Sequence, residues 1–269
     1  MEAKIYHIDA FSDELFCGNP ACVILLPYEI SDDLMLSIAA ENGVAETAFL
    51  MKKQKSLGAN TFSLRWFTPD IEMDLCGHAT IAAAYVVYNI LGLDRAIFET
   101  REGIINVGKE IGCDGKIKYV LDFPIRLCAP SNLPDNIYKA LNIKPKEVYL
   151  ARDYILLYES QEQIKKIKIN REEFDKINLD PGGVAVTAAG DDCDFVSRFF
   201  TPQATILEDP VTGSAHCTLA PFWSKLLCKK ELTAKQISTR GGTLFCKILG
   251  ERVYISGGAI CFSEGVIKL

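Results

Sequence analysis

One pair of related stretches decides the fold: RWFTPDIEMDLCGHAT at residues 65–80 and RFFTPQATILEDPVTGSAH at residues 198–216. Each begins with Arg, two aromatic residues, Thr and Pro, continues through acidic residues, and ends in a small-residue turn that opens an apolar stretch. A later pair keeps the same order, with TREG at residues 100–103 and TRGG at residues 239–242. A repeat of about half the chain is too long for a solenoid and predicts a duplicated domain with a pseudo-two-fold axis.

The boundary between the two halves is predicted between residues 122 and 134, where proline clusters. We therefore expect a first half over residues 1–123 and a second half over residues 124–261. The last strand, at about residues 262–269, is a candidate to cross back to the first half. A site is expected in the cleft between the halves, because pockets form preferentially at domain interfaces.

The pattern of apolar residues predicts an α+β fold. One long helix is expected in each half, over residues 77–91 and 213–228; each opens on glycine and is apolar on most faces, which is typical of a buried helix. Shorter helices are expected at residues 31–42, 134–141, 160–165 and 171–177. Strands rich in β-branched and aromatic residues are predicted at residues 3–10, 20–26, 46–52, 60–67, 96–100, 104–108, 116–121, 147–150, 153–158, 183–188, 194–200, 236–240, 243–248 and 252–257.

The composition is that of an ordinary globular protein, since the 269 residues are 49% hydrophobic and 24% charged. A net charge of −6 does not attract a phosphate backbone, so nucleic acid is not an expected partner. No stretch resembles a targeting segment or approaches the roughly 18 apolar residues of a membrane helix, which predicts a cytoplasmic protein. The ten cysteines form no C-x-x-C pair and the three histidines lack zinc-ligand spacing, so neither disulfides nor a metal site is expected.

The two small-residue turns are candidates for a ligand site. If helices follow them, each turn presents unpaired backbone N–H groups and a partial positive charge, which bind carboxylate or phosphate. Gly77 and Gly213 let a ligand approach the backbone closely. An equally weighted alternative is that both glycines only allow buried helices to pack closely.

Several side chains near these turns are candidates for chemistry. His78 lies on the first turn of its helix and Ser214 takes the matching place in the second half, with Cys76 and Asp209 shortly before. Glu46 is a lone acid among apolar residues in the stretch NGVAETAF. Apolar surroundings favour a neutral carboxyl group, as a proton shuttle near neutral pH requires. The alternative for this glutamate is an exposed acid at a strand edge.

No cofactor motif competes with this interpretation. The sequence contains neither a Walker A motif nor a G-x-G-x-x-G that follows a strand. Nothing suggests a pyridoxal or flavin site, so an enzyme with this sequence is expected to work without a cofactor.

Five stretches resemble the phenazine-biosynthesis isomerase (PhzF-like) family: FCGNPA at 16–21, ETAF at 46–49, RWFTP at 65–69, DLCGHAT at 74–80 and EDPVTGSA at 208–215. They are spread over most of the chain in the family's order. That family shares its fold with diaminopimelate epimerase and proline racemase. The resemblance implies a duplicated α+β fold of two open β-barrels, each around a central helix, with the active site between them. It also implies a homodimer.

The resemblance implies roles for single residues as well. In the family's isomerase, the glutamate of the Glu-Thr-x-Phe motif moves a proton on a dihydro-hydroxy-aromatic acid, and Glu46 matches that glutamate. His78, Asp209 and Ser214 match the residues that hold the substrate and assist the transfer. Residues expected to bind the substrate, or to border it, are Asn19, Cys76, Gly77 and Gly213.

Three functions are left open by the sequence. The first is an isomerase that moves a proton on a small carboxylate-bearing metabolite, and it is favoured because the family's acid/base residues are all present. The second is an epimerase that uses Cys76. Its relatives use two cysteines, whereas this chain has Val211 near the second position, which counts against racemisation. The third is a binding protein that has lost turnover.

Overall fold

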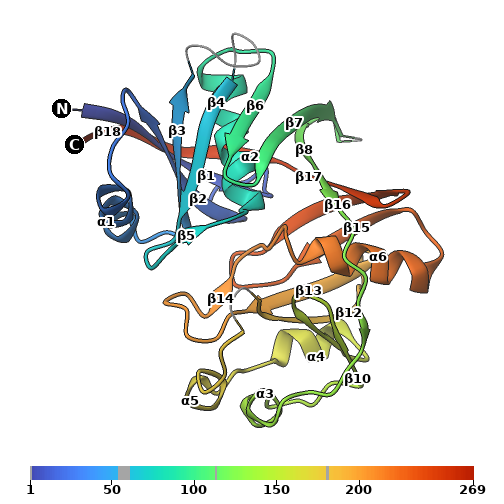
Figure 1. Cartoon of the computed structure of the whole chain (residues 1–269). Coiled ribbons are helices and arrows are strands. Elements are labelled where there is room, and N and C mark those ends of the chain that lie inside the picture. Colours follow the sequence, from blue (N-terminus) through green and yellow to red (C-terminus); the bar gives the residue numbers. More distant parts are fainter. Residues whose placement is uncertain (1, 54–60, 113, 180–181) are drawn as a thin grey trace. The chain divides into compact units, whose positions relative to one another are not determined.

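The computed structural model describes residues 2–53, 61–112, 114–179 and 182–269 (Figure 1). The chain divides into two compact units. Unit 1 runs to Asp122 and includes Ser256–Leu269, and unit 2 is Phe123–Ile255. Of the predicted strand at 60–67, residue 60 lies outside the described residues. Each unit is described by itself below.

Unit 1 is built on a mixed sheet. Antiparallel and parallel pairings alternate along it: β1–β2 antiparallel, β2–β3 parallel, β3–β4 antiparallel, β4–β6 parallel and β6–β7 antiparallel. The short strand β5 pairs with β4, and β7 pairs with β8. The strands are β1 (Glu2–Ala10), β2 (Asn19–Leu26), β3 (Glu46–Lys52), β4 (Thr61–Phe67), β5 (Glu72–Met73), β6 (Ala96–Thr100), β7 (Gly103–Ile111) and β8 (Ile117–Pro124).

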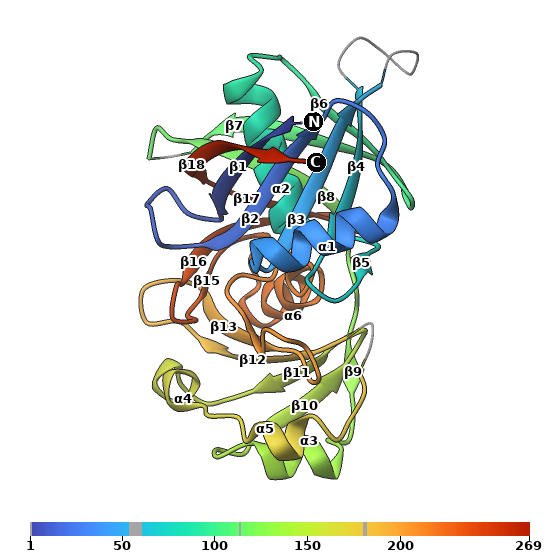
Figure 2. The same ribbon diagram turned by 90° about the vertical axis from the view of Figure 1, so that its left-hand side faces the viewer.

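The last strand of the chain belongs to this sheet. β18 (Ala259–Lys268) pairs antiparallel with β1, with Glu2 opposite Lys268. Both termini therefore lie side by side at one edge of unit 1 (Figures 1 and 2).

Unit 2 repeats the pairing pattern of unit 1. Its order is β10–β11 antiparallel, β11–β12 parallel, β12–β13 antiparallel, β13–β15 parallel and β15–β16 antiparallel. The short strand β14 pairs with β13 as β5 pairs with β4. The strands are β9 (Ala129–Pro130), β10 (Glu147–Leu150), β11 (Tyr154–Leu157), β12 (Val184–Ala189), β13 (Phe195–Phe200), β14 (Glu208–Asp209), β15 (Glu231–Gln236), β16 (Gly242–Leu249) and β17 (Arg252–Gly257).

The arginine of the repeated Arg-aromatic-Phe motif makes the same ion pair in both units. Arg65 on β4 forms a bidentate pair with Glu72 on β5, through contacts of 2.7 and 2.8 Å. Arg198 on β13 makes the same pair with Glu208 on β14, again at 2.7 and 2.8 Å. Bidentate pairing fixes the geometry of both partners, so each motif ties the short strand to the sheet. The duplication predicted from the sequence is confirmed at this level.

Two helical segments pack on opposite faces of the unit 1 sheet. The alternation along β2 places Cys22, Ile24 and Leu26 on one face, where they cluster with Met35 and Ala39 of α1 (Asp32–Asn42). The other face of β1, β2 and β3 contacts α2 (Gly77–Tyr85), which continues as the π-helix η1 (Val86–Ile90). Figure 2 shows α1 in front of these strands and α2 behind them. Every α2 residue from Gly77 to Ala84 is buried, as its apolar composition predicts.

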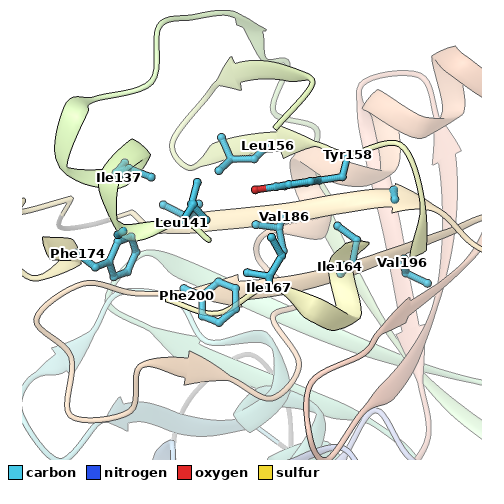
Figure 3. Close-up of a cluster of buried hydrophobic side chains, with 13 residues drawn as sticks. Ile137, Leu141, Leu156, Tyr158, Ile164, Ile167, Phe174, Val186, Val196 and Phe200 are labelled. Carbon is cyan, nitrogen blue, oxygen red and sulfur yellow. The ribbon is translucent and has the colours of Figure 1, made fainter. Parts of the chain in front are cut away.

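Unit 2 has a comparable core. Side chains from α3 (Asp135–Ala140), α4 (Gln161–Lys166) and α5 (Arg171–Phe174) pack against β11, β12 and β13 (Figure 3). The second long helix, α6 (His216–Leu227), contacts β15 and β16.

The structure corrects several predicted boundaries: the helix expected at 171–177 ends at Phe174, and the one expected at 77–91 is α-helical only to Tyr85. The helix expected from residue 213 begins at His216, because residues 213–215 form a tight turn with hydrogen bonds between residues three apart. The strand expected at 236–240 is instead β15, at 231–236. Its continuation is a turn in which Ser238 donates to the carbonyl of Pro210 and Gly241 takes a φ of 66°. A side-chain bond to the backbone of this kind competes with the strand ladder.

The nine cysteines among the described residues are all free. No helix in the described part of the chain is long and apolar enough to span a membrane.

Candidate active site

In unit 1, the first residue of β3 and the second residue of α2 form an ion pair. Glu46 Oε2 lies 2.9 Å from His78 Nε2, and the exposed fractions of the two side chains are 14% and 4%. β3 pairs in parallel with β2, and this register places Glu46 beside Ala21 at the end of the sheet where β2 begins. α2 packs on β2 and brings His78 to the same end. The two residues that the resemblance assigns to proton transfer are therefore in contact.

Asn19 and Cys76 complete this cluster on the other ring nitrogen. His78 Nδ1 lies 3.1 Å from Asn19 Nδ2 and 3.5 Å from Cys76 Sγ. Asn19 is fully buried as the first residue of β2, and it follows Gly18, whose φ is 75°. A Cβ at Gly18 would lie 2.2 Å from the carbonyl oxygen of Ala10, so only glycine fits this turn.

The charge state of the cluster follows from burial and proximity. Burial alone would lower the pKa of His78, but the neighbouring Cys76 and Glu46 outweigh it and raise the pKa well above 6.5. Burial raises the pKa of Cys76, and the charge of Glu46 raises it further. The raised pKa of Cys76 favours the protonated thiol, and the raised pKa of His78 favours the protonated ring.

These three side chains do not suit a single metal ion. Glu46, Cys76 and His78 each offer a ligand atom, and these atoms lie within 4.8 Å of one another. However, Glu46 faces Nε2 and Cys76 faces Nδ1. The two ring nitrogens direct their lone pairs away from each other, so one ion cannot use both sides of the ring. The arrangement favours proton sharing over chelation.

The start of α2 adds a second feature to this cluster. Cys76 is the N-cap, and its side chain makes no capping hydrogen bond. The first turn of α2 starts at Gly77, and its N–H groups carry the partial positive charge of a helix N-terminus.

In unit 2, Asp209 is held by a network around the predicted turn. Asp209 ends β14, and its Oδ2 accepts a 2.5 Å hydrogen bond from Thr212 Oγ1. The buried amide of Gln236 spans the same turn: Nε2 donates to the carbonyl of Asp209 at 2.7 Å, and Oε1 accepts from the N–H of Thr212 at 2.8 Å. No local pattern pointed to Gln236, because it lies 24 residues beyond Thr212.

Ser214 lies in the turn before α6, directly after Gly213, and it has a cationic partner. Arg152 Nη2 donates to Ser214 Oγ at 3.1 Å and also contacts Asp153 Oδ2 at 3.2 Å. The structure therefore gives Ser214 a charged neighbour that no motif in the sequence indicated.

His216 belongs to the same segment and is a packing residue. It is fully buried, its Nδ1 lies 2.8 Å from the carbonyl oxygen of Thr212, and its ring stacks on Phe195 with centroids 5.7 Å apart. Burial lowers its pKa to about 4, against a smaller opposing effect of the Thr212 carbonyl. His216 is therefore a neutral imidazole, and its contact with the Thr212 carbonyl holds the turn before α6 in place.

Comparison with solved structures identifies the fold. A hydroxyproline epimerase from Agrobacterium vitis superimposes with a TM-score of 0.62 at 10% identity, covering 99% of this chain and 92% of that one. At this identity the match shows the fold alone. The chain has the diaminopimelate epimerase-like α+β fold that the sequence predicted.

Closer matches give the family. The profile of the phenazine biosynthesis-like protein family (PhzC/PhzF) matches residues 8–265. A PhzF family structure from Enterococcus faecalis has a TM-score of 0.90 at 40% identity, with full coverage of both chains. An uncharacterized isomerase of Pseudomonas aeruginosa is 41% identical over 273 residues, again over the full length of both. The chain belongs to the phenazine biosynthesis-like (PhzF) family, and the expectation of an enzyme of the isomerase class is confirmed.

Proposed function

We propose that this isomerase moves a proton between two carbon atoms of a small carboxylate-bearing metabolite, with Glu46 as the general acid/base. The observation that carries the proposal is the contact of Glu46 with the buried His78 at 2.9 Å. An isomerisation of this kind needs one group that takes a proton from one carbon and returns it to another. A carboxylate held beside a histidine that keeps its own proton is suited to that task.

The chemistry balances without a further reactant. Glu46 removes a proton from one carbon, and the electron pair of the broken C–H bond spreads over the adjacent unsaturated system. The carboxylic acid so formed returns the proton to a different carbon, which regenerates the carboxylate. The Nε2 side of His78 faces the carboxylate and positions it, and Asn19 and Cys76 contact the ring on the Nδ1 side.

The remaining predicted residues are proposed to bind the substrate. Negative charge develops on the substrate during the transfer and is stabilised by fixed donors. The hydroxyl of Ser214 and the backbone N–H groups at Gly77 and Gly213 are proposed as such donors. Asp209, whose carboxylate is oriented by Thr212, is proposed to accept from a polar group of the substrate. No cofactor enters this scheme.

Hydrogen exchange tests the proposal directly. The protein is incubated in D2O with a panel of small unsaturated and hydroxylated carboxylic acids, and NMR follows the entry of deuterium into carbon positions. We expect deuterium at one carbon of an accepted compound, and loss of the exchange by a factor of at least about 100 in Glu46→Gln, the range that general acid/base catalysis contributes. Glu41→Gln, an exposed glutamate on α1, is the matched control. Full exchange in Glu46→Gln would refute the role of Glu46.

One observation supports a second candidate, an epimerase that uses Cys76. Its Sγ lies 3.5 Å from His78 Nδ1, so the thiol and the ring are close enough for the proton transfer that this mechanism needs. The raised pKa of Cys76 argues against a resident thiolate. Cys76→Ala separates the two mechanisms. Retained hydrogen exchange in this variant supports the carboxylate mechanism. Loss of exchange in this variant, together with inversion at the labelled carbon in the unmodified protein, supports the epimerase.

A further inference from the structure

In the described part of unit 1, Glu46 is paired in the sheet on one side only. It lies opposite Ala21 of β2, but the ladder between β3 and β4 begins one residue later, with Thr47 opposite Phe67. The position of the Glu46 backbone therefore depends on its neighbour Thr47 and on residues 43–45, the loop that leads from α1 into β3.

Thr47 is fixed by pairing on both sides and by a side-chain hydrogen bond. It lies opposite Cys22 of β2 as well as Phe67 of β4, and only 1% of its surface is exposed. Its Oγ1 accepts a hydrogen bond of 3.0 Å from Nδ2 of Asn42, the last residue of α1. A buried hydroxyl is costly unless it is hydrogen-bonded, so this contact is favourable and ties β3 to the end of α1.

The same hydrogen bond closes a short loop. Residues 43–45 alone separate α1 from Glu46. Gly43 ends the helix in the left-handed region, with a φ of 61°, and its N–H donates back to the last turn of the helix at 3.2 Å. Because the helix end is fixed at Gly43 and the strand is fixed at Thr47, the loop has little freedom to shift Glu46.

The hydrogen bond lies on the face of the sheet opposite the candidate site. Successive side chains of a strand point to opposite faces. The two residues opposite Thr47 belong to the apolar cluster that packs on α1, whereas Glu46 faces α2 and meets His78 at 2.9 Å. The contact of Asn42 with Thr47 is therefore separated from Glu46 and His78 by the sheet, and it acts on them through the backbone of β3.

We propose that Asn42 and Thr47 are positioning residues for the proton transfer, because their hydrogen bond sets the place of the Glu46 carboxylate and thus its contact with His78. The inference deepens the proposed function, on which it rests, by assigning part of the acid/base geometry to a pair that does not touch His78. Such geometry matters because a displacement of about 1 Å at a reacting group can lower a rate by about 100-fold.

Two single variants remove the hydrogen bond, one from each end. Thr47→Val keeps the shape and the β-branching of the side chain between two apolar neighbours, and Asn42→Ala removes the donor. We expect deuterium exchange at least about tenfold slower in each variant. The double variant is expected to be no slower than the slower single variant, because both changes remove the same contact.

Two further variants serve as controls. Thr47→Ser retains the hydroxyl that accepts from Asn42, so its exchange rate is expected to stay close to that of the unmodified protein. Ser37→Ala removes an exposed hydrogen bond within α1, from Ser37 Oγ to the carbonyl of Asp33, and is expected to exchange at the full rate.

The pKa of His78 reports the place of Glu46 without any substrate. Burial lowers this pKa, and the neighbouring Cys76 and Glu46 raise it. A carboxylate that moves away lowers it again, so NMR titration of the imidazole is expected to give a lower pKa in Thr47→Val and Asn42→Ala, shifted toward the value in Glu46→Gln. The melting temperature is measured in parallel. A merely structural role would lower the melting temperature and leave the pKa of His78 unchanged.

The proposal is overturned if both single variants keep the pKa of His78, whether or not their exchange is slower. Failure of the proton-transfer proposal gives a different result. If Glu46→Gln exchanges hydrogen at the full rate while Thr47→Val lowers the pKa of His78, the mechanism fails and the role of the pair in placing Glu46 stands.

Discussion

Acidification is expected to destabilise the protein through His216. Burial holds its pKa at about 4 in the folded protein, against an ordinary value of 6.5. Between these two values the unfolded chain binds a proton that the folded protein does not, so stability rises with pH across this window and is lost as the pH falls through it. For these two pKa values, the loss between pH 7 and pH 5 is about 2 kcal/mol.

A neutral variant isolates this contribution from all other titrating groups. His216→Asn keeps an N–H donor in reach of the Thr212 carbonyl but cannot titrate, and it removes the ring that stacks on Phe195. It is therefore expected to be less stable at pH 7. Its free energy of unfolding in urea should nevertheless fall by about 2 kcal/mol less between pH 7 and pH 5 than that of the unmodified protein. An identical pH dependence in the two proteins would show that His216 is not buried in its neutral form.

Two further predictions concern the proposed site. Gln236→Leu leaves the N–H of Thr212 and the carbonyl of Asp209 without their buried partner, and we expect it to lower the unfolding free energy measured in urea by about 3 kcal/mol. The imidazole NMR signals of His78 should show a protonated ring at pH 7, because its pKa is raised well above 6.5, and Glu46→Gln should bring that pKa down. The stabilisation from this raised pKa is present below pH 6.5 and is lost as the pH rises through the folded value.

The Gln236 prediction has a matched control, and the His78 prediction has a contradicting outcome. Lys235→Met lies on the same strand as Gln236 but removes only a surface ion pair with Asp192, so a change within about 0.5 kcal/mol is expected. If Gln236→Leu costs no more than this, the turn around Thr212 is held by other contacts. For His78, a ring that is neutral at pH 7 would contradict the assigned charge of the pair.

The sequence predicted those features that local pattern and repetition encode. The two Arg-aromatic-Phe motifs revealed the duplication, because Arg65 and Arg198 make the same bidentate pair in the same kind of strand. Glu46 and His78 were singled out by motif, and in the structure they are in contact.

Other features depend on contacts between residues far apart in the chain. Arg152 and Ser214 are 62 residues apart and Thr212 and Gln236 are 24 apart, and neither pair is part of a repeated motif. The start of α6 was misplaced for a different reason. The turn at residues 213–215 has hydrogen bonds between residues three apart, and an apolar pattern does not distinguish that turn from the first turn of an α-helix.

The pairing of β18 with β1 has a consequence for how the chain is made. Unit 2 is one continuous segment, Phe123–Ile255, so its last residue is translated before any residue of β18. Unit 1 begins first but needs β18, whose residues are the last to be translated, to cover the open edge of β1. Until then β1 presents an unpaired edge, the kind of surface on which nascent chains associate wrongly. Unit 1 is therefore expected to complete its folding after unit 2, although its synthesis begins first. Chaperone contact during synthesis is expected at β1.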